Sequence, residues 1–441
     1  QQELERNQQS LVNDDVRDNV IAFRFPRLAG INLDKIIFPY ASILAEGEGT
    51  ISPGLFDSWS KEWQEFKSGA KATVQHLASM FDRKKAAAVA ARTQVAKTGR
   101  LDMTMLHKYK MTEDIFLRNR IEIKGKNHGI VVYVDWSGSM SESMQETIAQ
   151  ATVLAMFCKK VGIPFRVYGF TTFRKEERNV DPYDLRRPED YLYEAPLDYT
   201  LSWDAPERRE RMNLAPFTLL EIFSSEMSNQ EFDRMGTYLR QFAPRRAQVI
   251  RCLNLTGTPL NESIIAAMPI GLKFKATYNI DVLNSIWLTD GEGGNPFFGA
   301  IGTTQIRETG EVFNITRDRS GTDTLFRIYK SLVGGNLIGF FLAAKRRIES
   351  TIYYSGDRNA QARIEKFRTN KFIEQKHDGY DTYFLLDRSV AVYTGSDTME
   401  SLPETASSTR VLNAFRKDLV KRAISRPLLN SITDRIAKEM V

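Results

Sequence analysis

Cysteine and histidine are scarce in this sequence of 441 residues, which holds two cysteines and four histidines. The cysteines, Cys158 and Cys252, are too few for a disulfide framework, and the histidines show no metal-ligand spacing. A disulfide-stapled fold and a four-ligand zinc site are therefore excluded. We expect a protein of a reducing compartment, the cytoplasm.

Long apolar runs are also missing. The longest, Leu337–Ala344, falls far short of the roughly 20 residues that a membrane-spanning helix needs. The polar opening QQELERNQQS lacks the hydrophobic core of a signal peptide. We therefore expect no membrane insertion.

A nucleotide-binding loop of the form G-x-x-x-x-G-K-[ST] is absent as well. The glycines of GEGGNPFFG follow Asp290 and do not open a clean helix, so they favour a flexible loop over a phosphate cradle. We expect that the chain does not bind ATP in the P-loop manner, and that any energy coupling comes from another subunit.

What is present is the composition of a globular protein, with 42% hydrophobic, 11% aromatic and 26% charged residues. The net charge of +6 is unevenly distributed, because residues 83–126 hold 12 Lys and Arg against 4 Asp and Glu. Clustered cations can neutralise nucleic-acid phosphates. No nucleic-acid-binding motif accompanies them, so a solvated helix face or a surface for an acidic partner is favoured.

The pattern along the chain predicts four regions. Residues 1–57 mix polar and short apolar stretches and indicate a loosely packed arm. Residues 58–127 form a helical basic region, 128–350 an α/β domain with a polar insertion at 171–250, and 351–441 an extension that ends in a helix. Their combined length fits two or three domains.

Two kinds of hydrophobic periodicity support this division. Trp59, Trp63 and Phe66 have the spacing of a buried helix stripe. From Gly129 onward, apolar strand-like runs alternate with helices, which predicts a doubly wound, mostly parallel α/β sheet. The expected elements are strands GIVVYVD, PFRVYGF, VLNSIWLTDG, NLIGFFLAA and TYFLLD, a helix over Ser141–Val161 that buries Cys158, a more helical stretch over Phe217–Phe242, and a last helix near Val411–Met440.

Oxygen-bearing side chains follow the strand ends of this predicted sheet. The segment VVYVDWSGSM places Asp135, Ser137 and Ser139 directly after the first strand, and Asp290 follows a later strand. Thr258, in LTGTPL, stands just before a helix-compatible run. Because ligands bind at the carboxyl edge of open parallel sheets, these five can converge on one hard cation, Mg²⁺ or alternatively Mn²⁺ or Ca²⁺.

With its D-x-S-x-S motif in that context, the chain resembles a von Willebrand factor A (VWA) domain with a metal-ion-dependent adhesion site, or MIDAS. In that family the serines and a threonine ligate the metal, while the aspartates act directly or through water. The resemblance thus implies metal binding by Asp135, Ser137, Ser139, Thr258 and Asp290. It also implies that the metal's open position receives an acidic residue of a partner protein.

A narrower resemblance extends over about residues 84–441. GRLDMTML, NHGIVVYVDWSGSM, VYGFTT and the tail VLNAFRKDLVKRAISRPLLNSITDRIA are similar to the VWA subunit of aerobic-type cobaltochelatase, CobT, and to CobT-like proteins of tailed phages. The implied partner is a ring-forming AAA+ ATPase of the chelatase or MoxR type. The long acidic low-complexity region common in chelatase subunits is absent.

Enzymatic alternatives lack the residues that they need. A haloacid-dehalogenase-type phosphatase requires a second carboxylate two residues after the first, where this chain has Ser137. A serine hydrolase requires a G-x-S-x-G elbow, which DWSGSM does not supply. We therefore expect no intrinsic catalytic activity.

Two other functions remain open at this stage. One is a phage or structural interaction module that uses the VWA domain for docking without chelatase activity, in the host cytoplasm if the chain is phage-encoded. The other is a nucleic-acid-associated protein that binds through the basic residues 83–126.

Overall fold

A mixed α/β fold is built around one large sheet. The computed structural model describes residues 21–92, 94–96, 103, 109–111, 119–121, 127–172, 212, 214, 217–240, 249–291, 293, 296–297, 301–315, 321–354, 359–377 and 379–387. In the eight-stranded sheet the order is β12 (Phe372–Gln375), β13 (Thr382–Asp387), β11 (Asn336–Ala343), β8 (Val282–Thr289), β5 (His128–Asp135), β6 (Phe165–Thr171), β7 (Thr218–Ser224) and β2 (Ile37–Phe38).

The centre of this sheet is parallel. Strands β13, β11, β8, β5 and β6 all run in one direction, while β7 is antiparallel to β6 and β12 is antiparallel to β13. This confirms the prediction of a mostly parallel α/β sheet. The strand β13 also confirms the strand expected from TYFLLD.

Alternation along the strands divides the core into two layers. Ile130, Val132 and Val134 of β5 pack into one hydrophobic cluster, and Val131 and Tyr133 pack into the other. Because side chains of a strand point alternately to opposite faces, a strand that is apolar throughout is buried on both sides. All eight positions of β5 are buried accordingly.

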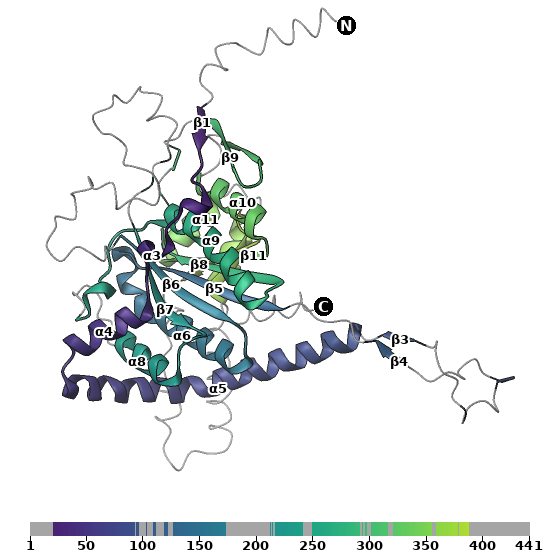
Figure 1. Ribbon diagram of the computed structural model, residues 1–441, viewed down its shortest axis with the longest axis horizontal. Coiled ribbons are helices and arrows are strands. Elements are labelled where there is room, and N and C mark those ends of the chain that lie inside the picture. The colour runs from purple at the N-terminus through teal and green to yellow at the C-terminus, as the bar shows by residue number, and fades with distance from the viewer. Residues whose placement is uncertain are drawn as a thin grey trace, which may run out of the picture.

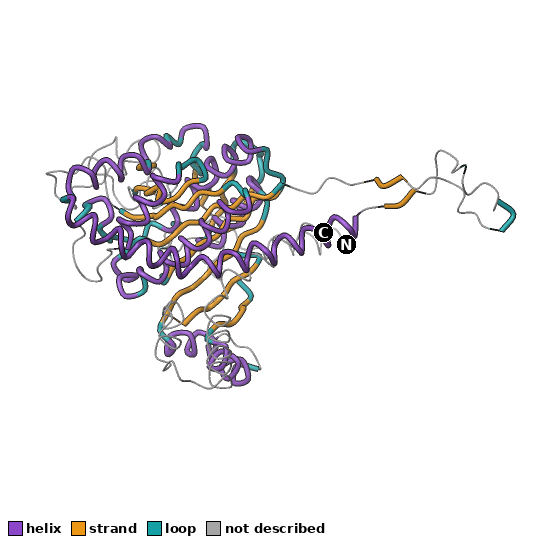
Figure 2. The backbone as a smooth tube through the Cα atoms, turned by 90° about the horizontal axis from the view of Figure 1, so that it is seen from below, coloured by secondary structure: helices purple, strands orange, loops and turns teal. Residues whose placement is uncertain are grey.

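Helices cover both faces of the sheet (Figures 1 and 2). One face packs against α6 (Met144–Val161), α8 (Asn229–Arg240) and part of α5 (Pro53–Arg92), and the other against α9 (Leu260–Tyr278) and α10 (Gly321–Val333). Helix α6 ends at Gly162, whose φ of 73° gives the left-handed cap that favours glycine. Cys158 is buried in α6, as expected.

The N-terminal segment packs more closely than a loose arm. It holds β1 (Ile21–Arg24), η1 (Leu28–Gly30), α3 (Leu33–Ile36), β2 and α4 (Tyr40–Thr50). Strand β2 pairs with β7, and Phe38 and Ile43 are buried in the main core. The prediction of loose packing over 1–57 therefore differs from the structure of residues 21–57. Their short apolar stretches are buried by distant partners that the local pattern does not show.

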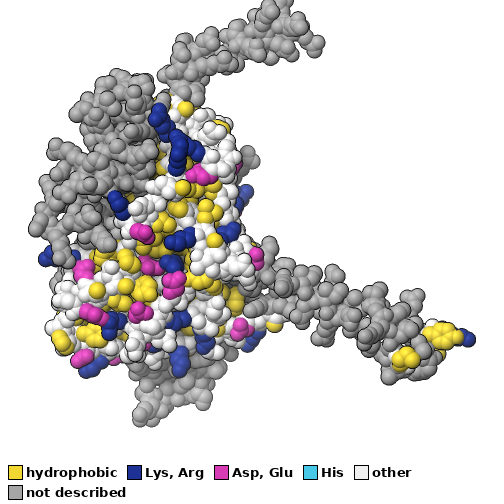
Figure 3. Space-filling view, in the orientation of Figure 1, with side chains coloured by type: hydrophobic (Ala, Val, Ile, Leu, Met, Phe, Trp, Pro, Cys, Tyr) yellow, Lys and Arg dark blue, Asp and Glu magenta, His cyan; other side chains and the backbone are white. Residues whose placement is uncertain are grey.

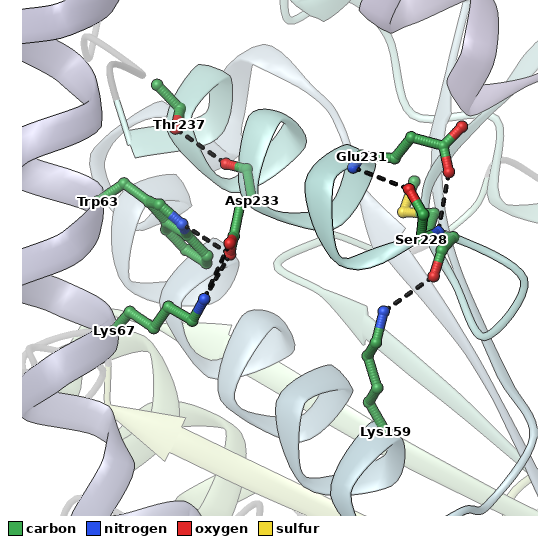
Figure 4. A network of polar contacts seen from close by, with 8 residues as sticks. Trp63, Lys67, Lys159, Ser228, Glu231, Asp233 and Thr237 are labelled. Atoms are coloured by element: carbon green, nitrogen blue, oxygen red, sulfur yellow. Dashed lines mark hydrogen bonds and ion pairs between the residues drawn. The ribbon is translucent and has the colours of Figure 1, made fainter.

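Helix α5 is held to the body by polar and apolar contacts with α8 (Figure 4). Trp63 Nε1 donates to Asp233 Oδ1 at 3.1 Å, and Lys67 Nζ donates to the same oxygen at 2.7 Å. The Trp63 ring lies so close to Gly236 that a Cβ there would stand 2.4 Å from it. The predicted stripe is confirmed, since Trp59, Trp63 and Phe66 are all buried.

The far end of α5 extends away from the body toward the short hairpin of β3 (Gln94–Ala96) and β4 (Asn119–Ile121) (Figure 1). Most of the basic region 83–126 lies outside the described residues. On the face seen in Figure 3, basic and acidic side chains are interspersed over most of the body, with one group of basic side chains near β1. The body surface on that side is mixed in charge.

The insertion and the C-terminal extension contribute to the main sheet. The stretch 217–240, expected to be mainly helical, begins with the strand β7, which is buried at every position, before α8 follows. After β11, the helices α11 (Lys345–Tyr354) and α12 (Ala360–Asn370) precede β12 and β13 at the sheet edge. The helix expected near Val411–Met440 lies outside the described residues.

A three-stranded sheet completes the described part. It pairs β1 with β9 (Gly302–Gln305) and β9 with β10 (Val312–Ile315). Two further 3-10 turns are η3 (Gly138–Glu142) and η5 (Arg251–Leu253), and η3 carries Ser139 of the site described next. Among the described helices, none is both long and apolar enough to cross a bilayer.

Candidate metal site

The strand order changes direction beside β5. From β5 the chain continues to β6 on one side, whereas β8 lies on the other side and leads on to β11. In open α/β sheets, ligands bind at such a switch point, outside the carboxyl ends of the strands, which here are those of β5 and β8. Asp135 is the last residue of β5, and Asp290 directly follows β8.

Asp135 is a fully buried carboxylate with an unsatisfied oxygen. Its Oδ2 accepts a hydrogen bond from Thr289 Oγ1 at 2.7 Å, while its buried Oδ1 has no hydrogen-bond partner. Burial raises the pKa of Asp135 to about 7, the nearby Asp290 adds to the rise, and the Thr289 hydrogen bond opposes it. Ionising a carboxylate buried in this way is unfavourable, and a bound cation would offset that cost.

The loop after β5 brings its two serines toward Asp290. The Oγ atoms of Ser137 and Ser139 lie 3.0 Å apart, and Ser139 Oγ donates to Asp290 Oδ1 at 2.7 Å. Ser137 is buried, whereas Ser139 is exposed on η3. Residues 151 positions apart in the sequence are thus joined directly at the sheet edge.

A third loop, before α9, is fixed beside the first by backbone hydrogen bonds. Gly138 N donates to Thr256 O at 2.9 Å, and Thr256 N donates to Trp136 O at 3.3 Å. Thr258 follows in this loop and is half-buried, and its Cγ2 lies 4.0 Å from the place of a Cβ on Gly291. All five predicted residues therefore lie at one edge of the sheet, on three separate loops.

Three residues at this edge were not singled out by the sequence. Thr289 donates a hydrogen bond to Asp135, and its place at the end of β8, directly before Asp290, is the signal that the sequence offers. Thr256 Oγ1 lies 2.5 Å from Thr171 Oγ1 and so joins the carboxyl end of β6 to the third loop. Arg347 Nη1 donates to Asp290 O at 3.2 Å, and no sequence spacing indicates that contact.

The donor set fits a hard divalent cation. It consists of two carboxylates and three hydroxyls, all oxygen, and one carboxylate oxygen is buried without a partner. Across the described residues, no group of three or more His, Cys, Asp or Glu side chains could hold a metal. A metal at this edge would accordingly depend on hydroxyl ligands in addition to Asp135 and Asp290.

The two cysteines lie away from this chemistry. Burial raises the pKa of the Cys158 and Cys252 thiols well above the ordinary value. Both therefore stay protonated at neutral pH and are poor nucleophiles.

Comparison with known proteins identifies no family. No protein-family model and no curated protein matches the chain. Two crystal structures of the pilus adhesin SpaC from Lactobacillus rhamnosus GG match at 12% identity. One matches with a TM-score of 0.25 over 49% of this chain. The other, an open conformation, matches with a TM-score of 0.28 over 69% of this chain. The matches span 24% and 30% of the adhesin chain. TM-scores of this size do not establish a common fold.

Proposed function

We propose that the chain is a non-catalytic, VWA-type subunit that binds Mg²⁺ at the MIDAS-like edge and there captures an acidic residue of a partner protein. The observation that carries this proposal is Asp135, a fully buried carboxylate with one oxygen that lacks a hydrogen-bond partner. Ser137 lies close to this carboxylate, and its hydroxyl is 3.0 Å from that of Ser139. An anion buried in this way is stabilised best by a cation.

The chemistry of the donors favours docking over catalysis. Hydroxyl ligands are neutral, so the bound ion would keep much of its positive charge and attract a carboxylate from outside. Mg²⁺ supplies exchangeable coordination positions for such a ligand. The chain's own part is to hold the ion and to orient the three loops. Backbone hydrogen bonds between Gly138, Thr256 and Trp136 join two of these loops, and the hydrogen bond from Ser139 to Asp290 joins the third.

The partner that we propose is a ring-forming AAA+ ATPase of the chelatase or MoxR type, in the cytoplasm. The resemblance of the sequence to CobT-like proteins supports this partner, and so does the absence of a P-loop in a chain whose expected role is coupled to ATP hydrolysis. Cobaltochelatase-like activity would belong to the whole complex.

Co-purification tests the proposal. The tagged chain is expressed together with an AAA+ ATPase of the chelatase or MoxR type, and the ATPase retained on the tag is measured with MgCl₂ and with EDTA. We expect retention only with Mg²⁺, and its loss in Asp135→Asn and Ser137→Ala. The matched controls Asp57→Asn and Ser58→Ala alter exposed residues of α5 and should retain the ATPase. Retention that survives EDTA and both site variants would contradict the proposal.

A further inference from the structure

Three consecutive cations stand beside the candidate metal site. Lys345, Arg346 and Arg347 begin α11 directly after β11, and all three are exposed. The Arg347 guanidinium lies 5.0 Å from the centre of the Phe341 ring and donates to Asp290 O at 3.2 Å. The cluster of residues 345–347, which we call the basic cluster, is therefore placed at the metal edge by direct contact.

The charge of this cluster is mostly uncompensated. Lys345 Nζ is 3.9 Å from Glu349 Oε1, but Glu349 is held more closely by Arg368, whose Nε lies 2.7 Å from the same oxygen. In the described part of the chain Arg346 forms no ion pair. A divalent ion would balance Asp135 and Asp290, so these aspartates would not neutralise the cluster.

The position of the cluster also costs stability. A helix N-terminus carries partial positive charge, so cations in the first turn are unfavourable and acidic residues are preferred there. Helix α11 has no acidic residue in its first turn. Such a departure from the local preference is typical of functional sites. Because these cations stand at a ligand-binding edge, an anionic ligand would offset their unfavourable interaction with the helix dipole.

The charges around the site favour one path for the ligand across the surface. The basic cluster lies on the β11 side of the site, where it would attract an acidic chain. Charge complementarity therefore favours an acidic segment that reaches the metal and then continues over α11.

We propose that the basic cluster binds the acidic residues that flank the metal-bound carboxylate of the partner, so that the partner presents an acidic stretch and not a single acid. This inference rests on the proposed metal-dependent docking and specifies its ligand. Arg347 both faces the metal edge and fixes the Asp290 loop, while Lys345 and Arg346 extend the positive surface outward.

Fluorescence anisotropy with two labelled peptides tests the inference. One peptide is a run of consecutive glutamates, and the other has the same length with every glutamate but one replaced by glutamine. In MgCl₂ we expect the full-length chain to bind the first peptide more tightly. The double variant Lys345→Glu with Arg346→Glu should weaken that binding about tenfold or more, because two attractive charges are lost and their reversal adds repulsion. Its binding of the single-glutamate peptide should change much less.

The controls separate this inference from the function on which it rests. Lys61→Glu with Lys71→Glu makes the same charge change on exposed residues of α5 and should leave both affinities unchanged. The double variant places glutamates where the α11 dipole favours them, so its helix should be at least as stable, which circular dichroism can check.

Two different failures can be told apart. Equal binding of the glutamate peptide by wild type and the double variant, with Mg²⁺ dependence intact, would overturn the basic-cluster inference alone. Binding of both peptides that is unaffected by EDTA and by Ser137→Ala would overturn the metal-dependent docking as well. A short single-stranded DNA that competes as well as the glutamate peptide would overturn the assignment to an acidic protein segment.

Discussion

Replacing Asp135 with asparagine should stabilise the metal-free protein while abolishing its response to Mg²⁺. Asparagine keeps the size of the side chain and an oxygen that can accept the Thr289 hydrogen bond, but it removes the buried charge. Without metal, wild type must either bury that charge or hold a proton on Asp135. The variant is free of this requirement at every pH.

The magnitude follows from the pKa of Asp135, which burial raises from 3.8 to about 7. Because the folded state holds the proton more tightly, the contribution of Asp135 to the stability of metal-free wild type should fall as pH rises from about 4 to about 7 and level off above that. Over the two pH units between about 5 and about 7, the free energy of unfolding that Asp135 contributes should fall by at most roughly 3 kcal/mol. The advantage of Asp135→Asn should therefore grow by about 2–3 kcal/mol over that interval.

Urea unfolding in EDTA at about pH 5 and about pH 8, followed by thermal unfolding with MgCl₂, measures both effects. Wild type should gain about 2.7 kcal/mol when Mg²⁺ reaches a hundredfold excess over its dissociation constant, whereas Asp135→Asn should gain nothing. Equal stabilisation of the two proteins by Mg²⁺ would refute the assignment of Asp135 as part of the metal site. An advantage that does not change with pH would refute the reasoning about its proton.

Three further outcomes are expected. The Mg²⁺ affinity of wild type, measured by isothermal titration calorimetry, should rise with pH up to about 7 and then level off, because the ion binds ionised Asp135. An affinity independent of pH would contradict the binding of Mg²⁺ to this carboxylate. Thr289→Val removes the hydroxyl that donates a hydrogen bond to Asp135 and lowers its pKa. The midpoint pH of Mg²⁺ binding should therefore be higher in this variant. An unchanged midpoint would show that this hydrogen bond does not stabilise the carboxylate. Gly236→Ala places a Cβ 2.4 Å from the Trp63 ring and should lower the free energy of unfolding in urea by about 1–3 kcal/mol. The control Gly49→Ala, whose Cβ meets nothing within 4 Å, should not lower it. Equal effects of the two substitutions would contradict close packing of α5 on α8.

The central part of the candidate site could be predicted from the sequence because its physics is local. An apolar strand followed by Asp135, Ser137 and Ser139 places three oxygens in one loop, whatever the rest of the chain does. The rule that strand ends of parallel sheets meet at one edge then brings in Asp290. The direct hydrogen bond between Ser139 and Asp290 agrees with that reasoning.

The remaining features depend on contacts between distant segments. The contact of Arg347 with Asp290 requires β11 to pair with β8, and a strand's partners cannot be read from its own periodicity. For the same reason β7 looked like part of a helical stretch, although its pairing with β6 and β2 makes it a buried antiparallel strand. Tertiary pairing overrode the local pattern there.

The most direct test of the central claim is a crystal structure of the chain grown with Mn²⁺, in which the anomalous signal locates the metal without reference to any activity. We predict a peak at the carboxyl edge of β5 and β8, within coordination distance of the Ser137 and Ser139 hydroxyls and beside Asp135. A map with no peak at that edge, or with Mn²⁺ bound only elsewhere, would contradict the account.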